Sequence, residues 1–140
     1  MSTYDTNLAA EFYVLSMLHR LGADAALTLG NKKAVDIIVA PTPGRTVTID
    51  VKGGAGPPDW PCDNIRLPAP GTHFLVLVSF ERKIADPYKV PSVWVVPANE
   101  IEPFITAYEV RKVVVRSAIR SQGAKYLHSW SRILEVPDAF

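Results

Sequence analysis

Val35-Asp36-Ile37-Ile38-Val39 and Val47-Thr48-Ile49-Asp50-Val51-Lys52 are two short apolar runs that carry charged residues where a core strand would be apolar. Both runs are rich in β-branched residues, which predicts two strands. Because side chains alternate between the two faces of a strand, Asp50 and Lys52 point the same way, about 7 Å apart. Asp36 stands at the head of the neighbouring run. Charged groups on core-like strands are costly unless they pair, bind a metal or do chemistry.

Length and composition fit one domain over residues 1–140. The chain has 140 residues and a formal net charge of +1, which argues against a strongly basic protein that coats nucleic acid. No stretch approaches about 20 uninterrupted apolar residues, so we expect no membrane span. The first residues lack the basic and apolar regions of a signal peptide. Cys62 is the only cysteine, so we expect no internal disulfide and a reducing, cytoplasmic location.

The pattern along the chain predicts an α/β (α+β) fold with a central mixed β-sheet flanked by helices. A cap at Thr6 or Asn7 and a stop at Gly22 bound a first helix, and Glu11 lies within its apolar stripe. The segments that follow are a strand at 26–29, a hairpin connection at 41–45 between the two charged strands, a long Gly- and Pro-rich loop at 53–72, a buried strand at 74–80, a strand at 93–96, a helix from about 97 to 108, a short strand or helix at 113–115 and an ambiguous piece at 125–130.

Two carboxylates and a lysine are the side chains that an enzyme needs to cleave phosphodiesters with the help of a metal ion. Mg²⁺ is typically held by one or two carboxylates together with waters and phosphate oxygens. Asp36, Asp50 and the carbonyl oxygen of Val51 are therefore its expected ligands, and Mn²⁺ can substitute. Lys52 would orient or help to deprotonate the attacking water and stabilise charge on the phosphate. Glu11 would bind a water on the ion, or a second ion.

The order Glu11, Asp36, Asp50-Val51-Lys52 resembles the PD-(D/E)XK nuclease superfamily, which has the restriction-endonuclease-like fold. In that family a helix supplies an acidic residue, a hairpin supplies the D…(D/E)XK ligands, and a central strand and a second helix complete the core. The resemblance covers roughly residues 7–106, although Val35 replaces the proline that names the motif. It implies a small stand-alone Mg²⁺-dependent nuclease that acts on DNA in preference to RNA. A homodimer is plausible, since a two-strand cut needs two active sites.

A basic segment without acidic residues lies between Val110 and Leu134. It can hold a phosphate backbone, or it can be an ordinary solvated surface. Its basic residues are Arg111, Lys112, Arg116, Arg120, Lys125 and Arg132.

The candidate site residues also have plainer interpretations. Asp50 and Lys52 could form an exposed salt bridge on an edge hairpin, worth about 0–1 kcal/mol. Asp36 could cap a turn, and Glu11 could be solvated at the margin of its stripe. These alternatives stay open at the level of the sequence.

The aromatic and imidazole groups are expected to be structural. Trp60 could stack on a base, but we favour its anchoring the long loop to the core. His19, His73 and His128 show no metal-ligand spacing to one another. For the whole protein, the alternatives to an enzyme are a catalytically silent nucleic-acid- or protein-binding module, and an accessory subunit of a larger restriction or repair complex.

Overall fold

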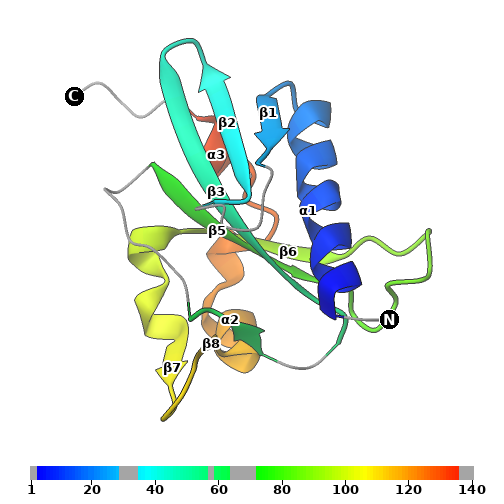
Figure 1. Cartoon of the computed structure of the whole chain (residues 1–140), viewed down its shortest axis with the longest axis vertical. Helices are drawn as coiled ribbons and strands as arrows, with labels where there is room; N and C mark the ends of the chain where they lie inside the picture. The colour runs from blue at the N-terminus through cyan, green and yellow to red at the C-terminus, as the bar shows by residue number, and fades with distance from the viewer. Residues whose placement is uncertain (1–2, 29–34, 57–58, 64–71, 136–140) are drawn as a thin grey trace.

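The computed structural model describes residues 3–28, 35–56, 59–63 and 72–135. Its helices are α1 (Thr3–Arg20), α2 (Arg116–Gln122) and α3 (Ser131–Leu134), with 3-10 turns η1 (Ala98–Glu100), η2 (Glu102–Phe104) and η3 (Ala124–Tyr126). Its strands are β1 (Asp24–Leu27), β2 (Ile37–Thr42), β3 (Arg45–Gly54), β4 (Trp60–Pro61), β5 (His73–Ser79), β6 (Ser92–Pro97), β7 (Ile105–Ala107) and β8 (Lys112–Val114) (Figure 1). Within the described ranges, no helix is both long and apolar enough to cross a membrane.

Five strands form one mixed sheet in the order β1-β2-β3-β5-β6. The two charged strands are β2 and β3, and they pair antiparallel, as the sequence predicts, with Ile37 opposite Ile49. β3 pairs in parallel with β5, where Asp50 lies beside Leu75. Every residue of β5 is buried, which confirms the predicted central strand. The predicted fold class, a mixed sheet flanked by helices, is confirmed.

The helix α1 covers one face of this sheet. Ala10, Val14 and Leu18 are 0% exposed and belong to the same hydrophobic cluster as the alternate residues of β3 that point toward the helix. Their spacing of four residues places these side chains on one helical stripe. The helix starts ahead of the expected cap, because Asn7 is inside it and accepts a hydrogen bond from the Gly53 N–H at 3.1 Å.

The other face of the sheet is covered by a smaller antiparallel sheet in the order β4-β8-β7 and by α2. A second hydrophobic cluster fills the space between the layers, with Leu75, Leu77, Trp94 and Val96 from the large sheet and Trp60, Val114 and Ile119 from the covering elements. Trp60 is 1% exposed, and its Nε1–H donates to the carbonyl oxygen of Val78 at 3.2 Å. The predicted anchoring of the loop by Trp60 is confirmed.

The prediction of a helix from about 97 to 108 is wrong. The chain there makes the two short turns η1 and η2 and then the strand β7. Pro103 supplies no N–H for the hydrogen bond that would continue an α-helix, and it stands near the start of η2, where proline is tolerated. Ile105 and Thr106 are β-branched, so they favour the extended strand that follows.

The last third of the chain differs from expectation in detail. Residues 113–115 overlap the strand β8, which decides between strand and helix there. The helix α2 was not predicted, because it is short and Val115 at its N-terminus gives no side-chain cap. The ambiguous 125–130 piece joins η3 to α3. The predicted long loop contains β4, and its residues 57–58 and 64–71 lie outside the described residues.

Candidate active site

The polar face of β3 points away from α1. Its Val47, Ile49 and Val51 pack in the cluster under the helix, so Thr48, Asp50 and Lys52 point to the opposite face by alternation. On that face the parallel register sets Asp50 beside Leu75 and Lys52 beside Leu77. Asp50 is only 9% exposed, so the exposed salt bridge considered above is excluded as the setting of Asp50.

Asp36 is held where β2 begins. The backbone N–H of Asp36 donates to the carbonyl oxygen of Ile49 at 2.9 Å, and the Asp36 carbonyl accepts from the N–H of Thr28 at 2.9 Å. The Thr28 hydroxyl also donates to the carbonyl of Val35. The Asp36 carboxylate therefore has little freedom to move along the sheet.

The Asp36 side chain takes the place of a backbone partner at the edge of β3. Its Oδ2 accepts a hydrogen bond from the N–H of Val51 at 2.7 Å, in place of a further backbone partner from β2. The N–H and C=O of one extended residue face the same neighbouring strand. The carbonyl of Val51 therefore faces the same edge as the Asp36 carboxylate, next to Asp50 in the chain.

Glu11 lies on the inner face of α1 and is 9% exposed, which excludes the solvated alternative. Asn7, one helical turn earlier, contacts the N–H of Gly53 on β3. Because residues four apart lie on one helical row, Glu11 comes next to β3 near Val51. It approaches from the face opposite Asp50, so it can reach the other candidates only around the strand edge.

Lys52 is half-buried beneath the smaller sheet. Burial raises the pKa of the Cys62 thiol and the charge of Asp63 adds to the rise, while the nearby charges of Lys52 and Lys112 oppose it. The Lys52 ammonium thus lies within electrostatic reach of Cys62, at the start of the segment after β4. Its position beside Asp50 on one face is the predicted one.

His73 is a site neighbour that sequence reasoning missed. Its Nε2 lies 3.2 Å from Oδ2 of Asp50, and its Nδ1 lies 2.7 Å from Oγ1 of Thr48. His73 is the first residue of β5 and is 2% exposed. The spacing of histidines along the chain carries no signal for this contact, because it depends on the parallel register of β3 and β5.

The carboxylates do not form one compact cluster. Across residues 3–28, 35–56, 59–63 and 72–135, no three His, Cys, Asp or Glu side chains gather closely enough to hold a metal ion. The oxygen donors at the β2 side of β3 are the Asp36 carboxylate and the Val51 carbonyl, and Asp50 is the next residue along β3, where its carboxylate contacts His73 of β5. Two carboxylates and a carbonyl suit a hard cation that keeps several waters.

Several residues of the basic segment form ion pairs with carboxylates. Arg116 donates to Ser79 and Glu81, each at 3.2 Å, and Arg120 donates to the other oxygen of Glu81. Burial raises the pKa of Glu81, but the hydrogen bonds from Arg120 and Ser79 and the charges of both arginines outweigh it, so the pKa falls below its ordinary 4.5.

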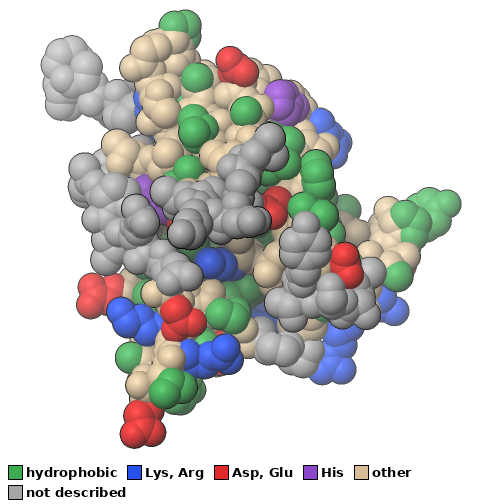
Figure 2. All heavy atoms as spheres, in the orientation of Figure 1, with side chains coloured by type: hydrophobic (Ala, Val, Ile, Leu, Met, Phe, Trp, Pro, Cys, Tyr) green, Lys and Arg blue, Asp and Glu red, His purple; other side chains and the backbone are tan. Residues whose placement is uncertain are grey.

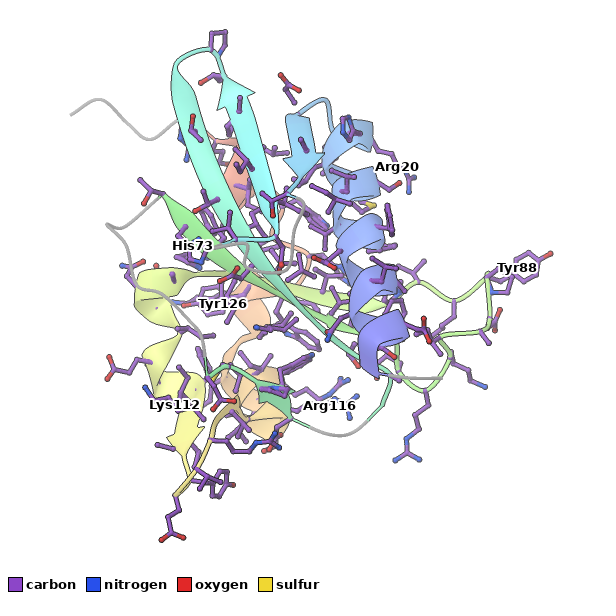
Figure 3. All side chains as sticks on the ribbon, viewed as in Figure 1. Arg20, His73, Tyr88, Lys112, Arg116 and Tyr126 are labelled. Atoms are coloured by element: carbon purple, nitrogen blue, oxygen red, sulfur yellow. The ribbon has the colours of Figure 1, made fainter. Side chains whose placement is uncertain are left out.

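Arg111 and Lys112 have exposed side chains. Lys125 is also exposed but lies 3.9 Å from Glu100, and both Lys125 and Arg132 lie over the Tyr126 ring. Figure 3 shows Lys112 on β8 and Arg116 on α2, at the same end of the molecule, with His73 nearer its middle. In Figure 2, Lys and Arg side chains around this end alternate with Asp and Glu rather than forming a patch of one sign. Such mixing weakens any long-range attraction for phosphates.

Comparison with known proteins finds a likeness among solved structures and none among the families or curated proteins searched. No protein-family pattern matches the sequence, and no curated protein matches it. Among solved structures, the bacterial homing endonuclease I-Ssp6803I matches with a TM-score of 0.57 and 17% sequence identity, over 95% of this chain and 91% of that chain. At this identity the likeness concerns the fold alone.

Proposed function

We propose that this protein is a metal-dependent nuclease of PD-(D/E)XK type that hydrolyses phosphodiester bonds in DNA. The observation that carries the proposal is the contact of the Asp36 carboxylate with the Val51 N–H, next to Asp50 in the chain, with Lys52 on the same face of β3 as Asp50. The fold likeness to a protein named a homing endonuclease supports it.

The donor set fits Mg²⁺, with Mn²⁺ as a substitute. Asp36, Asp50 and the Val51 carbonyl would hold the ion through oxygen atoms, which hard cations prefer. Two carboxylates on neighbouring strands repel when they come close, and a divalent cation between them would remove that cost. When bound, the ion would neutralise charge on the scissile phosphate and lower the pKa of a water.

The remaining candidates act on the water and the phosphate. The Lys52 ammonium would donate hydrogen bonds to the phosphate oxygens, where charge grows in the transition state, and would orient the attacking water. Glu11 would hold a further water at the edge of β3. The half-buried setting of Lys52 keeps its charge in a region of low dielectric, where such contacts are strongest.

Metal binding is the first test of this function. Ligands that bind only the folded state stabilise it by mass action, by about 2.7 kcal/mol at a concentration 100 times Kd. We expect the melting temperature to rise with Mg²⁺ or Mn²⁺, and Asp50→Asn to abolish the rise. Asp24→Asn, at an exposed position on β1, is the matched control and should respond as the wild type does. An equal rise in Asp50→Asn would remove the metal site.

Cleavage is the second test, and it separates an enzyme from a silent binding module or an accessory subunit. Lys52→Ala should retain the metal-dependent rise in melting temperature, yet cut plasmid DNA about 10²–10³ times more slowly. Lys52→Arg should restore little, because the guanidinium is broader and always protonated. Wild-type protein that binds metal but cuts no DNA would favour the binding module or the accessory subunit.

A further inference from the structure

A buried imidazole bridges two residues of the candidate site's strand. His73, labelled in Figure 3, starts β5 and lies directly beside Thr48 of β3 in the parallel register. Asp50 is two residues further along β3, on the same face. The His73 side chain spans both, with 2.7 Å to the Thr48 hydroxyl and 3.2 Å to the Asp50 carboxylate.

Hydrogen-bond chemistry places a proton on the nitrogen that faces Asp50. A carboxylate only accepts, so the contact to Asp50 requires a proton on Nε2. The other nitrogen, Nδ1, lies 2.7 Å from the Thr48 hydroxyl. That hydroxyl also donates to the carbonyl of Thr72 at 3.2 Å, so it is itself held in place.

We propose that His73 is a positioning residue that orients the Asp50 carboxylate for the cation. The Nε2–H would hold Oδ2 and leave Oδ1 to the cation. The inference rests on the proposed function, since it assigns a role at that same site. Outer partners of this kind limit the rotation of a ligating carboxylate, and their loss typically reduces metal affinity about 10- to 100-fold.

The alternative is a purely structural pair that only satisfies a buried carboxylate. Both interpretations predict some loss of stability when His73 is replaced. They differ in metal affinity, and in rescue by a side chain that restores only the donor. The experiment therefore measures Mn²⁺ binding by calorimetry, and separately the melting temperature in EDTA.

Three variants carry the test. His73→Leu removes the donor at similar volume, and we expect Mn²⁺ affinity to fall about 10- to 100-fold. His73→Gln restores an N–H donor and should recover most of the affinity. His128→Asn is the matched control: His128 is exposed with φ 53°, a conformation that Asn tolerates, so its affinity should equal the wild type's.

Two further measurements keep the proposal open to refutation if His73→Leu does not fold. Thr48→Val removes the hydroxyl that holds Nδ1, and it should weaken Mn²⁺ binding with little change in volume. In the wild type, ¹⁵N NMR should find the His73 proton on Nε2. A proton on Nδ1 alone would overturn the proposal.

The possible outcomes distinguish failure of the positioning role of His73 from failure of the proposed nuclease function. If wild type and Asp50→Asn both fail to bind Mn²⁺, the proposed function fails, and the positioning role fails with it. If the wild type binds and Asp50→Asn does not, the function stands. Wild-type affinity in folded His73→Leu, or in Thr48→Val when His73→Leu is unfolded, would then overturn the positioning role alone.

Discussion

The close approach of α1 to β3 makes Gly53 the position where one added methyl group should do most harm. A Cβ atom at residue 53 would lie 2.7 Å from the Cβ of Ala10 and 2.9 Å from the carbonyl oxygen of Thr6. Carbon atoms pack best at about 3.5–4.0 Å, so the helix and the strand would have to separate by about 0.8 Å or more. Ala10 is 0% exposed, so the helix cannot yield locally.

The magnitude follows from two opposing effects. Overpacking of this kind costs about 1–3 kcal/mol. Replacing glycine by alanine also restricts the unfolded chain, which returns about 0.4–1 kcal/mol. We therefore expect Gly53→Ala to lower the free energy of unfolding by about 1–2 kcal/mol. At about 2.1 cal/mol/K per residue, this corresponds to a fall in melting temperature of about 3–7 °C.

The assay is urea unfolding followed by circular dichroism, with scanning calorimetry alongside. Gly56→Ala is the matched control, because its added Cβ would meet only the flexible Arg82 side chain, at 3.4 Å. It should be neutral or slightly stabilising. In an Ala10→Gly background the cost of Gly53→Ala should shrink by about 0.5 kcal/mol or more, as expected for residues in contact. Stability of Gly53→Ala equal to that of Gly56→Ala would refute the close packing of α1 on β3.

Further predictions concern the charged groups at the other end of the molecule. The pKa of the Glu81 carboxyl is lowered by folding, so this group stabilises the protein when the pH is above its ordinary pKa of 4.5. The contribution disappears as the pH falls through the lowered pKa. Glu81→Gln should therefore be less stable than wild type at pH 7, and the difference in stability should vanish in acid. Glu109→Gln, at an exposed position, is the control and should show no such pH-dependent difference. A difference for Glu81→Gln that does not change with pH would refute the ion pair. Arg111→Ala with Lys112→Ala should weaken DNA binding on all sequences alike and reduce the slope of log affinity against log salt by about 0.9 per lost phosphate contact. An unchanged slope would assign both to solvated surface.

The part of the site that the sequence predicts is the part carried by one strand or one helix. Alternation along β3 places Asp50 and Lys52 on one face, and the stripe of α1 places Glu11 inward, because both depend on local periodicity alone. The sequence also places Asp36 at the start of the neighbouring strand. The structure differs in setting Glu11 on the opposite face of the sheet from Asp50, since the helix covers only one side.

Contacts between segments that are far apart in the chain could not be predicted from the sequence. His73 meets Asp50 because β5 lies parallel to β3, and nothing within either segment specifies that register. Arg116 and Arg120 pair with Glu81 across separations of 35 and 39 residues, so in the sequence they were two unpaired positive charges. Their positive charges are paired with Glu81, whereas the local sequence pattern suggested that they bind a phosphate. Whether either arginine also contacts DNA stays a prediction.

The lengths of the two connections that leave β3 also set an order of assembly. A tight turn at Pro43 and Gly44 joins β2 to β3, whereas residues 55–72 separate β3 from its parallel partner β5. Closing a longer loop costs more chain entropy, and non-local pairings slow folding. The hairpin that carries Asp36 and Asp50 can therefore form as a local unit before β5 pairs with β3. His73 reaches Asp50 only with the later pairing, so the Asp50 carboxylate gains this hydrogen-bond partner only when the sheet is completed.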